Sequence, residues 1–129
     1  MQPYYSDESV TLYHGDCREV TEWLAADVLV TDPPYGMSYR ARGAYDRTTG
    51  VTHKPLGEER VAGDDTTDAR DATLALWGDR PAIVFGTWRQ PRPANVAHRL
   101  IWWKRGAAPG PACSAFMLQD EEIYIIGKG

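Results

Sequence analysis

The sequence predicts a single-domain α/β fold with a mostly parallel sheet over residues 1–129. Three observations lead to this prediction. A strand pattern, a helix pattern and a second strand pattern follow one another between residues 10 and 31. Short apolar runs typical of buried strands recur later in the chain. A length of 129 residues suits one domain with a modest hydrophobic core.

Residues 10–31 contain the strand–helix–strand unit. The segment "VTLYHG", residues 10–15, alternates β-branched and aromatic residues and ends at a glycine, as short strands do. Residues 17–26 place apolar side chains at helical spacing, after a candidate N-cap at Asp16. The run "DVLVT", residues 27–31, is typical of a strand buried on both faces. This order is that of a βαβ unit, and it predicts parallel strands.

The chain after this unit alternates between irregular and regular segments. Residues 36–65 are rich in Gly, Arg, Thr and Asp and lack a sustained period, so we expect an irregular or poorly ordered loop. A helical pattern returns at residues 66–78. Further strands are expected at 81–86, 99–104 and 122–127.

Composition narrows the class of protein. No run approaches the roughly eighteen apolar residues of a membrane span, and the N-terminal residues do not resemble a signal peptide, so we expect a cytoplasmic protein. The two cysteines, Cys17 and Cys113, lack the spacing of a zinc site or a disulfide framework, and we expect no metal.

Charge is unevenly distributed along the chain. The formal net charge of −4 argues against a general nucleic-acid-binding protein. Residues 88–105, however, contain five basic residues and no acidic one, and residues 40–60 contain five basic and three acidic residues. Such segments can bind phosphates on an acidic protein, or they can simply form a solvated basic surface.

The segment "VLVTDPPYGMSY", residues 28–39, carries the most specific signal. Asp32-Pro33-Pro34-Tyr35 directly follows a predicted strand and resembles the catalytic motif of the amino-methyltransferases, which methylate exocyclic nitrogens of DNA bases. The upstream "YHGDCREVTEWL" resembles the opening segment of that family. The downstream "LIWWKR" and "DEEIYIIGKG" resemble two of its later strands.

This resemblance implies a Rossmann-like, S-adenosylmethionine-dependent methyltransferase fold and double-stranded DNA as the substrate. It also implies a contact from Asp16 to the adenine of the cofactor, although Asp16 could equally serve as a helix N-cap. Asp32 is expected to lie at both the cofactor and the target base. Adenine N6 is favoured over cytosine N4, because the adenine enzymes usually begin the motif with Asp. Glu121 matches a late Glu of the family and is expected to be a structural partner rather than a catalytic acid.

The chemistry of methyl transfer explains the residue types of the motif. An exocyclic amino nitrogen is a poor nucleophile, and acceptors for both of its N–H groups free its lone pair for attack. The Asp32 carboxylate and the Pro33 carbonyl can be those acceptors, since proline fixes φ and carries no N–H. Pro34 stiffens the same turn, and Tyr35 offers a flat face for stacking on a base turned out of the duplex. The motif could also be a rigid exit from the strand.

Three arginines of the long loop, Arg40, Arg42 and Arg47, are candidate nucleic-acid-binding residues through DNA phosphates, or they solubilise the loop. The family also carries a glycine-rich F-x-G-x-G loop that holds the methionine end of the cofactor, and no such loop follows here. The resemblance therefore implies an incomplete fold: a fragment, or a split enzyme whose second chain supplies the cofactor-binding half. The alternatives are a catalytically inactive nucleic-acid-binding relative and a protein-interaction domain with an open sheet edge.

Overall fold

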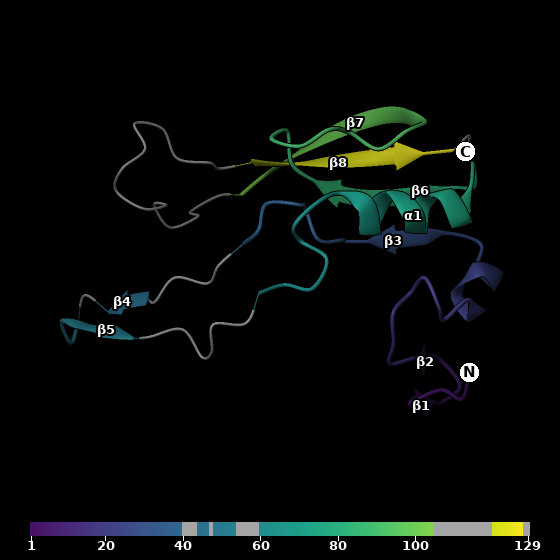
Figure 1. Ribbon diagram of the computed structural model, residues 1–129, viewed down its shortest axis with the longest axis horizontal. Coiled ribbons are helices and arrows are strands. Elements are labelled where there is room, and N and C mark those ends of the chain that lie inside the picture. Colours follow the sequence, from purple (N-terminus) through teal and green to yellow (C-terminus); the bar gives the residue numbers. More distant parts are fainter. Residues whose placement is uncertain (40–43, 47, 54–59, 105–119, 128–129) are drawn as a thin grey trace.

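The computed structural model describes residues 1–39, 44–46, 48–53, 60–104 and 120–127. Short strands, one 3-10 helix and one α-helix follow one another in the order β1 (Tyr5–Ser6), β2 (Thr11–Leu12), η1 (Glu22–Ala25), β3 (Leu29–Thr31), β4 (Ala44–Asp46), β5 (Val51–His53), α1 (Asp68–Trp77), β6 (Ala82–Gly86), β7 (Val96–Trp103) and β8 (Asp120–Ile126). Figure 1 shows that β1 and β2 lie beyond β3, away from the larger sheet.

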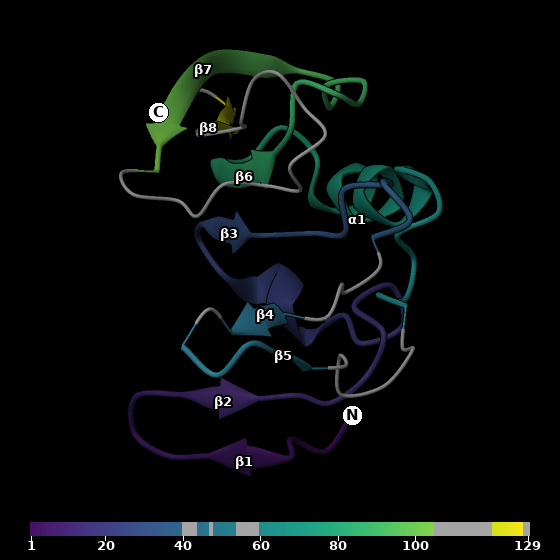
Figure 2. The ribbon, with the colours of Figure 1, turned by 90° about the vertical axis from the view of Figure 1, so that its left-hand side faces the viewer.

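A four-stranded sheet with the order β3-β6-β8-β7 forms the centre of the molecule. Strands β3 and β6 pair in parallel, whereas β8 pairs antiparallel with both of its neighbours. The register between β7 and β8 shifts once, between Val96 and His98. Helix α1 covers one side of this sheet, as Figure 2 shows.

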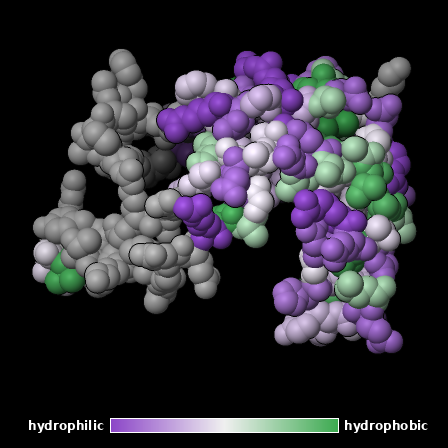
Figure 3. Space-filling model, in the orientation of Figure 1, coloured by the Kyte–Doolittle hydropathy of each residue, from purple (hydrophilic) through white to green (hydrophobic). Residues whose placement is uncertain are grey.

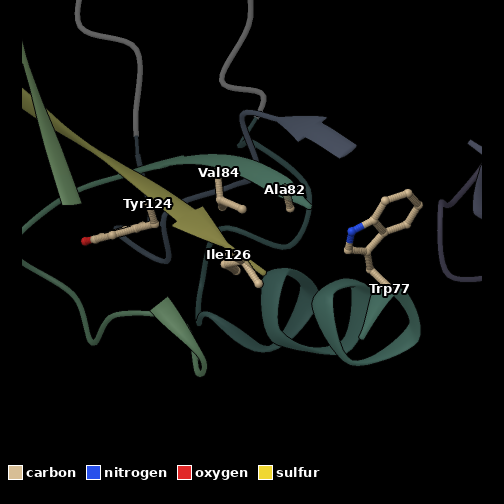
Figure 4. Close-up of a cluster of buried hydrophobic side chains, with 5 residues drawn as sticks. All are labelled: Trp77, Ala82, Val84, Tyr124 and Ile126. Carbon is tan, nitrogen blue, oxygen red and sulfur yellow. The ribbon is translucent and has the colours of Figure 1, made fainter. Parts of the chain in front are cut away.

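The hydrophobic core lies between α1 and the sheet. Strand β6 alternates buried and half-buried residues, as expected for a strand with one covered face. Trp77 of α1 stacks on Trp23, with 5.8 Å between ring centroids, and the Arg80 guanidinium lies 3.6 Å from the Trp77 ring centroid. The buried side chains of this cluster, drawn in Figure 4, are Trp77, Ala82, Val84, Tyr124 and Ile126.

The opposite face of the sheet is apolar but exposed. Val30 on β3 is 64% exposed and Trp102 on β7 is 47% exposed, and the Trp102 ring contacts Phe85 edge-on with 5.8 Å between centroids. Among the described residues, no helix packs on this face. By contrast, the side of the molecule that carries α1 shows hydrophilic and hydrophobic residues side by side in Figure 3.

The expected Rossmann-like α/β fold with a mostly parallel sheet is wrong. Within the described residues, α1 is the only α-helix, and the central sheet is mixed, with one hydrogen-bonded parallel pair and two antiparallel pairs. The other two sheets, β1-β2 and β4-β5, are antiparallel hairpins. Most of the regular structure is therefore strand, with little helix.

The predicted βαβ unit fails because local turn contacts prevail in residues 1–27. The Asp7 carboxylate accepts hydrogen bonds from the backbone N–H groups of Ser9 and Val10, each at 2.8 Å, and so closes the β1-β2 hairpin. The predicted strand at 10–15 is thereby reduced to two residues, which pair with β1 rather than with β3. The predicted helix at 17–26 is replaced by turns and the four-residue η1.

The later elements agree with the sequence predictions. Strands β3, β6, β7 and β8 and helix α1 fall within three residues of the predicted bounds. The loop at 36–65 was expected to be irregular, yet β4 and β5 form a hairpin inside it. No helix among the described residues has both the length and the apolar character needed to cross a lipid bilayer.

Candidate functional site

The Asp-Pro-Pro-Tyr motif begins where β3 ends. Thr31 is the last residue of β3, and Asp32 to Tyr35 follow it at the carboxyl end of the strand. Because β6 runs parallel to β3, the chain leaves β6 at the same edge of the sheet. The side-chain amide of Gln90, in the loop after β6, donates a 2.8 Å hydrogen bond to the Gly36 carbonyl, directly after the motif. The two loops are thus tied together beside the motif.

Two cavities border the motif, and Asp32, Pro33 and Pro34 line both of them. The smaller cavity has a volume of about 220 Å³ and lies between the motif and α1. Its remaining lining residues are Cys17, Thr31, Ala69, Arg70, Thr73 and Leu74. The larger cavity has a volume of about 440 Å³, and its remaining lining residues are Tyr35, Met37, Tyr39, Val61, Asp64 and Glu121.

Tyr35 is half-buried and lines the larger cavity. Its hydroxyl donates a long hydrogen bond, 3.4 Å, to Oε2 of Glu121. Burial raises the pKa of the Tyr35 phenol, and the Asp32 and Glu121 carboxylates raise it further. Tyr35 is therefore neutral at physiological pH and can donate a hydrogen bond while its ring borders the cavity.

Glu121 connects Tyr35 to a basic side chain. Lys104 Nζ donates a hydrogen bond to Oε1 of Glu121, and the two form an ion pair. Lys104 Nζ also lies 4.8 Å from the centroid of the Trp102 ring. Since Glu121 is held from one side by Lys104 and from the other by Tyr35, its contacts suit the structural role that the sequence suggested.

Asp16 faces a local partner in this structure. Its Oδ1 accepts 2.9 Å hydrogen bonds from the backbone N–H and from Nε of Arg18, and its Oδ2 pairs with the Arg18 guanidinium. The bonds from Arg18 hold the pKa of Asp16 well below its usual range. Asp16 caps a turn, and no α-helix begins after it within the described residues 17–26, so the prediction that Asp16 is the N-cap of a helix there is wrong. The neighbouring Cys17 lines the smaller cavity together with Asp32.

The basic candidates divide into two groups. Arg40, Arg42 and Arg47 lie outside the described residues. In the other basic segment, Arg99 and Arg92 both face the buried Glu122 carboxylate, at 2.8 and 3.6 Å. Three further bases of this segment behave differently: Arg89 lies 5.7 Å from the centroid of the exposed Trp88 ring, Lys104 pairs with Glu121, and Arg105 is outside the described residues.

Asp64 is the site residue that the sequence reasoning missed. Its side chain borders the larger cavity and is 4% exposed, and it accepts hydrogen bonds from backbone N–H groups that follow Tyr35. The sequence offers only a weak signal for it, an acidic pair after Gly63 just before the predicted helix. Its partners lie 25 to 28 residues upstream, and no spacing rule links them.

The described residues fit one part of S-adenosylmethionine rather than all of it. A cavity of about 220 Å³ falls below the range of roughly 300–1,000 Å³ in which drug-sized ligands are enclosed. Asp32 places an exposed carboxylate at this cavity, which suits a cationic sulfonium, whereas both oxygens of Asp16 are engaged by Arg18. Among the described residues, no group of three or more His, Cys, Asp or Glu side chains could hold a metal ion.

Comparison with known proteins adds no family to these observations. No family model, no curated protein and no solved structure matches the chain.

Proposed function

We propose that the chain is a DNA amino-methyltransferase, whole or as one part of a split enzyme, that methylates adenine N6 from S-adenosylmethionine. One observation carries the proposal: Asp32, Pro33 and Pro34 line two cavities, one bordered by α1 and the other by Tyr35 and Glu121. An in-line methyl transfer needs a donor and an acceptor on opposite sides of one set of polar groups. Because the two cavities share the motif residues, a donor in one and an acceptor in the other would both contact the same polar groups.

The larger cavity supports an amino-bearing base as the acceptor. A planar base can lie against the half-buried Tyr35 ring, and the Asp32 carboxylate and the Pro33 carbonyl can accept its two amino hydrogens. With S-adenosylmethionine bound, the donor would supply the methyl group, its S–C bond being replaced by the new N–C bond, and Asp32 could pass to solvent the proton that the base nitrogen loses. The protein mainly orients and polarises the amino group, because the sulfonium donor already carries an activated methyl group.

The smaller cavity suits a cofactor site that this chain forms only in part. Asp32 and the α1 residues beside it would hold one end of S-adenosylmethionine, and a glycine-rich half, in cis or as a second chain, would hold the other end. We therefore expect the 129-residue chain alone to bind the cofactor weakly and to methylate DNA slowly or not at all. Misplacement of a reacting atom by about 1 Å can cost roughly a hundredfold in rate.

The test is transfer of a tritiated methyl group to unmethylated DNA. The chain is assayed alone and together with the glycine-rich half of an amino-methyltransferase. We expect slow transfer or none in the first case and turnover in the second, with a loss of roughly a hundredfold or more for Asp32→Ala, by analogy with the removal of one preorganised polar group from an active site. Asp27→Ala is the matched control, because Asp27 is exposed and precedes β3 at the opposite end of the strand.

Two outcomes would contradict the proposal. Equal activity of the Asp32→Ala and Asp27→Ala variants would remove the motif from catalysis. DNA binding without methyl transfer in any combination would favour the second candidate, an inactive nucleic-acid-binding relative. The engagement of Asp16 by Arg18 is the observation that keeps this second candidate in view.

A further inference from the structure

The backbone that follows the motif wraps around a single buried carboxylate. The Gly36 and Met37 N–H groups donate to Asp64 Oδ1 at 2.8 and 3.2 Å, and the Tyr39 N–H donates to Asp64 Oδ2 at 2.6 Å. The Ser38 N–H donates to the backbone carbonyl of Asp64 at 2.6 Å. Four consecutive N–H groups after Tyr35 therefore bond to one residue.

This wrapping depends on an unusual backbone at Gly36. Its φ is +76°, and a Cβ at this position would lie 2.8 Å from the backbone carbonyl carbon of Thr66. Only glycine adopts such a conformation freely in so little space. The Gln90 amide bond to the Gly36 carbonyl ties the same residue from the other side. The chain direction just after Tyr35 is thus fixed by two side chains that are distant in sequence.

From these contacts we propose that Asp64 is a positioning residue, which orients Tyr35 in the larger cavity by holding the Gly36–Tyr39 backbone. The further step, that the oriented Tyr35 ring stacks on a base, rests on the proposed function. Asp64 and Tyr35 both line that cavity, and the anchored segment begins at the residue after Tyr35.

The carboxylate, rather than any polar side chain, suits this role. Hydrogen bonds from N–H groups to an ionised carboxylate are about twice as strong as neutral ones. Burial raises the pKa of Asp64, but the backbone N–H groups of Tyr39, Met37 and Gly36 outweigh burial and hold the pKa below its ordinary value. Asp64 is therefore charged at neutral pH. An asparagine has one acceptor oxygen, so it could keep the Gly36 and Met37 bonds but would turn an NH₂ group toward the Tyr39 N–H.

The first arm of the test measures the anchor without DNA. Amide hydrogen exchange at residues 36–39 should accelerate by roughly tenfold or more in Asp64→Ala, and Asp64→Asn should recover the protection of Gly36 and Met37 more than that of Tyr39. Asp65→Asn is the matched control, since Asp65 is exposed and, among the described residues, its side chain bonds only the Ser38 hydroxyl, at 3.3 Å. Amides of β6 should keep their protection in every variant, which separates loss of the anchor from loss of the fold.

The second arm measures the orientation of Tyr35. Nitration of tyrosines by tetranitromethane, followed by peptide mass spectrometry, reports the access of each ring. The Tyr35 rate relative to that of the exposed Tyr4 should rise severalfold in Asp64→Ala and stay unchanged in Asp65→Asn. Unchanged exchange at residues 36–39, or an unchanged Tyr35 rate, would overturn the inference.

The third arm separates the inference from the proposed function. Affinity for a DNA duplex with a mismatched adenine should fall about equally in Tyr35→Ala, Asp64→Ala and the double variant, because Asp64 acts through Tyr35. Additive losses would overturn the positioning role. If the wild-type chain binds no such DNA, the proposed function fails, while the exchange and nitration arms still decide whether Asp64 orients Tyr35.

Discussion

The two faces of the four-stranded sheet carry similar apolar side chains but serve different purposes. On the face covered by α1, Val84 and Tyr124 are fully buried. On the other face, Val30 is 64% exposed and Trp102 is 47% exposed. Because side chains alternate along each strand, the two sets come from the same strands, and the position of α1 decides which set is buried.

Two adjacent glutamates of β8, Glu121 and Glu122, lie on opposite faces of the sheet and have different partners. Glu122 on the covered face is 1% exposed and accepts hydrogen bonds from Arg99 and Tyr124. Glu121 on the open face contacts Lys104 and Tyr35 at the candidate site. The covered face therefore carries the stability of the sheet, and the open face contributes to the site. The following predictions test this division.

The largest effect is expected from a matched pair of tryptophans. Trp77→Ala should lower the free energy of unfolding by about 3–5 kcal/mol, because it leaves a cavity in the core and removes the stack on Trp23. Trp102→Ala should cost about 1 kcal/mol, mostly its edge contact with Phe85. Urea denaturation followed by circular dichroism measures both values. Equal costs would show that the open face is covered in the folded protein.

The next effect concerns the two glutamates and pH. Glu122→Gln should cost about 1.5–3 kcal/mol at neutral pH, because it removes a carboxylate that accepts charged and phenolic donors. Glu121→Gln should cost less than about 1 kcal/mol, since its pair with Lys104 is partly exposed.

The pH dependence of this difference has a definite sign. Burial raises the pKa of Glu122, but the hydrogen bonds from Tyr124 and Arg99 outweigh burial and lower it below the ordinary value. The stabilisation is therefore fully present above the unfolded pKa, about 4.3, and is lost as the pH falls through the lower folded pKa. The gap in unfolding free energy between wild type and Glu122→Gln should narrow in urea titrations below about pH 4. A gap that widens in acid would contradict this assignment.

A smaller effect is expected at Gly86, on the covered face. A Cβ there would lie 2.5 Å from Cε2 of Tyr124, whose hydroxyl is held by Glu122. The ring cannot turn away without breaking that bond, so Gly86→Ala should cost about 1–3 kcal/mol through overpacking. The Tyr124→Phe background is the control: without the hydroxyl bond the ring can shift, and the added cost of Gly86→Ala should shrink. An undiminished cost would place the clash elsewhere.

Sequence reasoning succeeded where local pattern and tertiary burial agree. The apolar runs that contain Val84 and Tyr124 predicted two strands of the central sheet, and the position of Asp32 at the end of β3 followed from the apolar run before it. The βαβ prediction failed because the Asp7 and Asp16 carboxylates close turns that periodicity does not register. Asp64 escaped prediction because its partners lie 25 to 28 residues upstream, and no sequence pattern links positions so far apart in an irregular segment.

The order of the strands also constrains the synthesis of the protein. Strand β8 follows β7 in the chain but lies between β6 and β7, and it provides all of the hydrogen-bonded pairing between them. At roughly 5–20 residues per second, the ribosome delivers β8 seconds after β7, and during this interval two apolar strands have open edges. Nascent chains stalled after Lys104 has left the ribosome should be cut readily by protease in β6 and β7, and those stalled after Ile126 has emerged should resist. The synthesis of β8 is thus the step that commits the nascent chain to this four-stranded sheet.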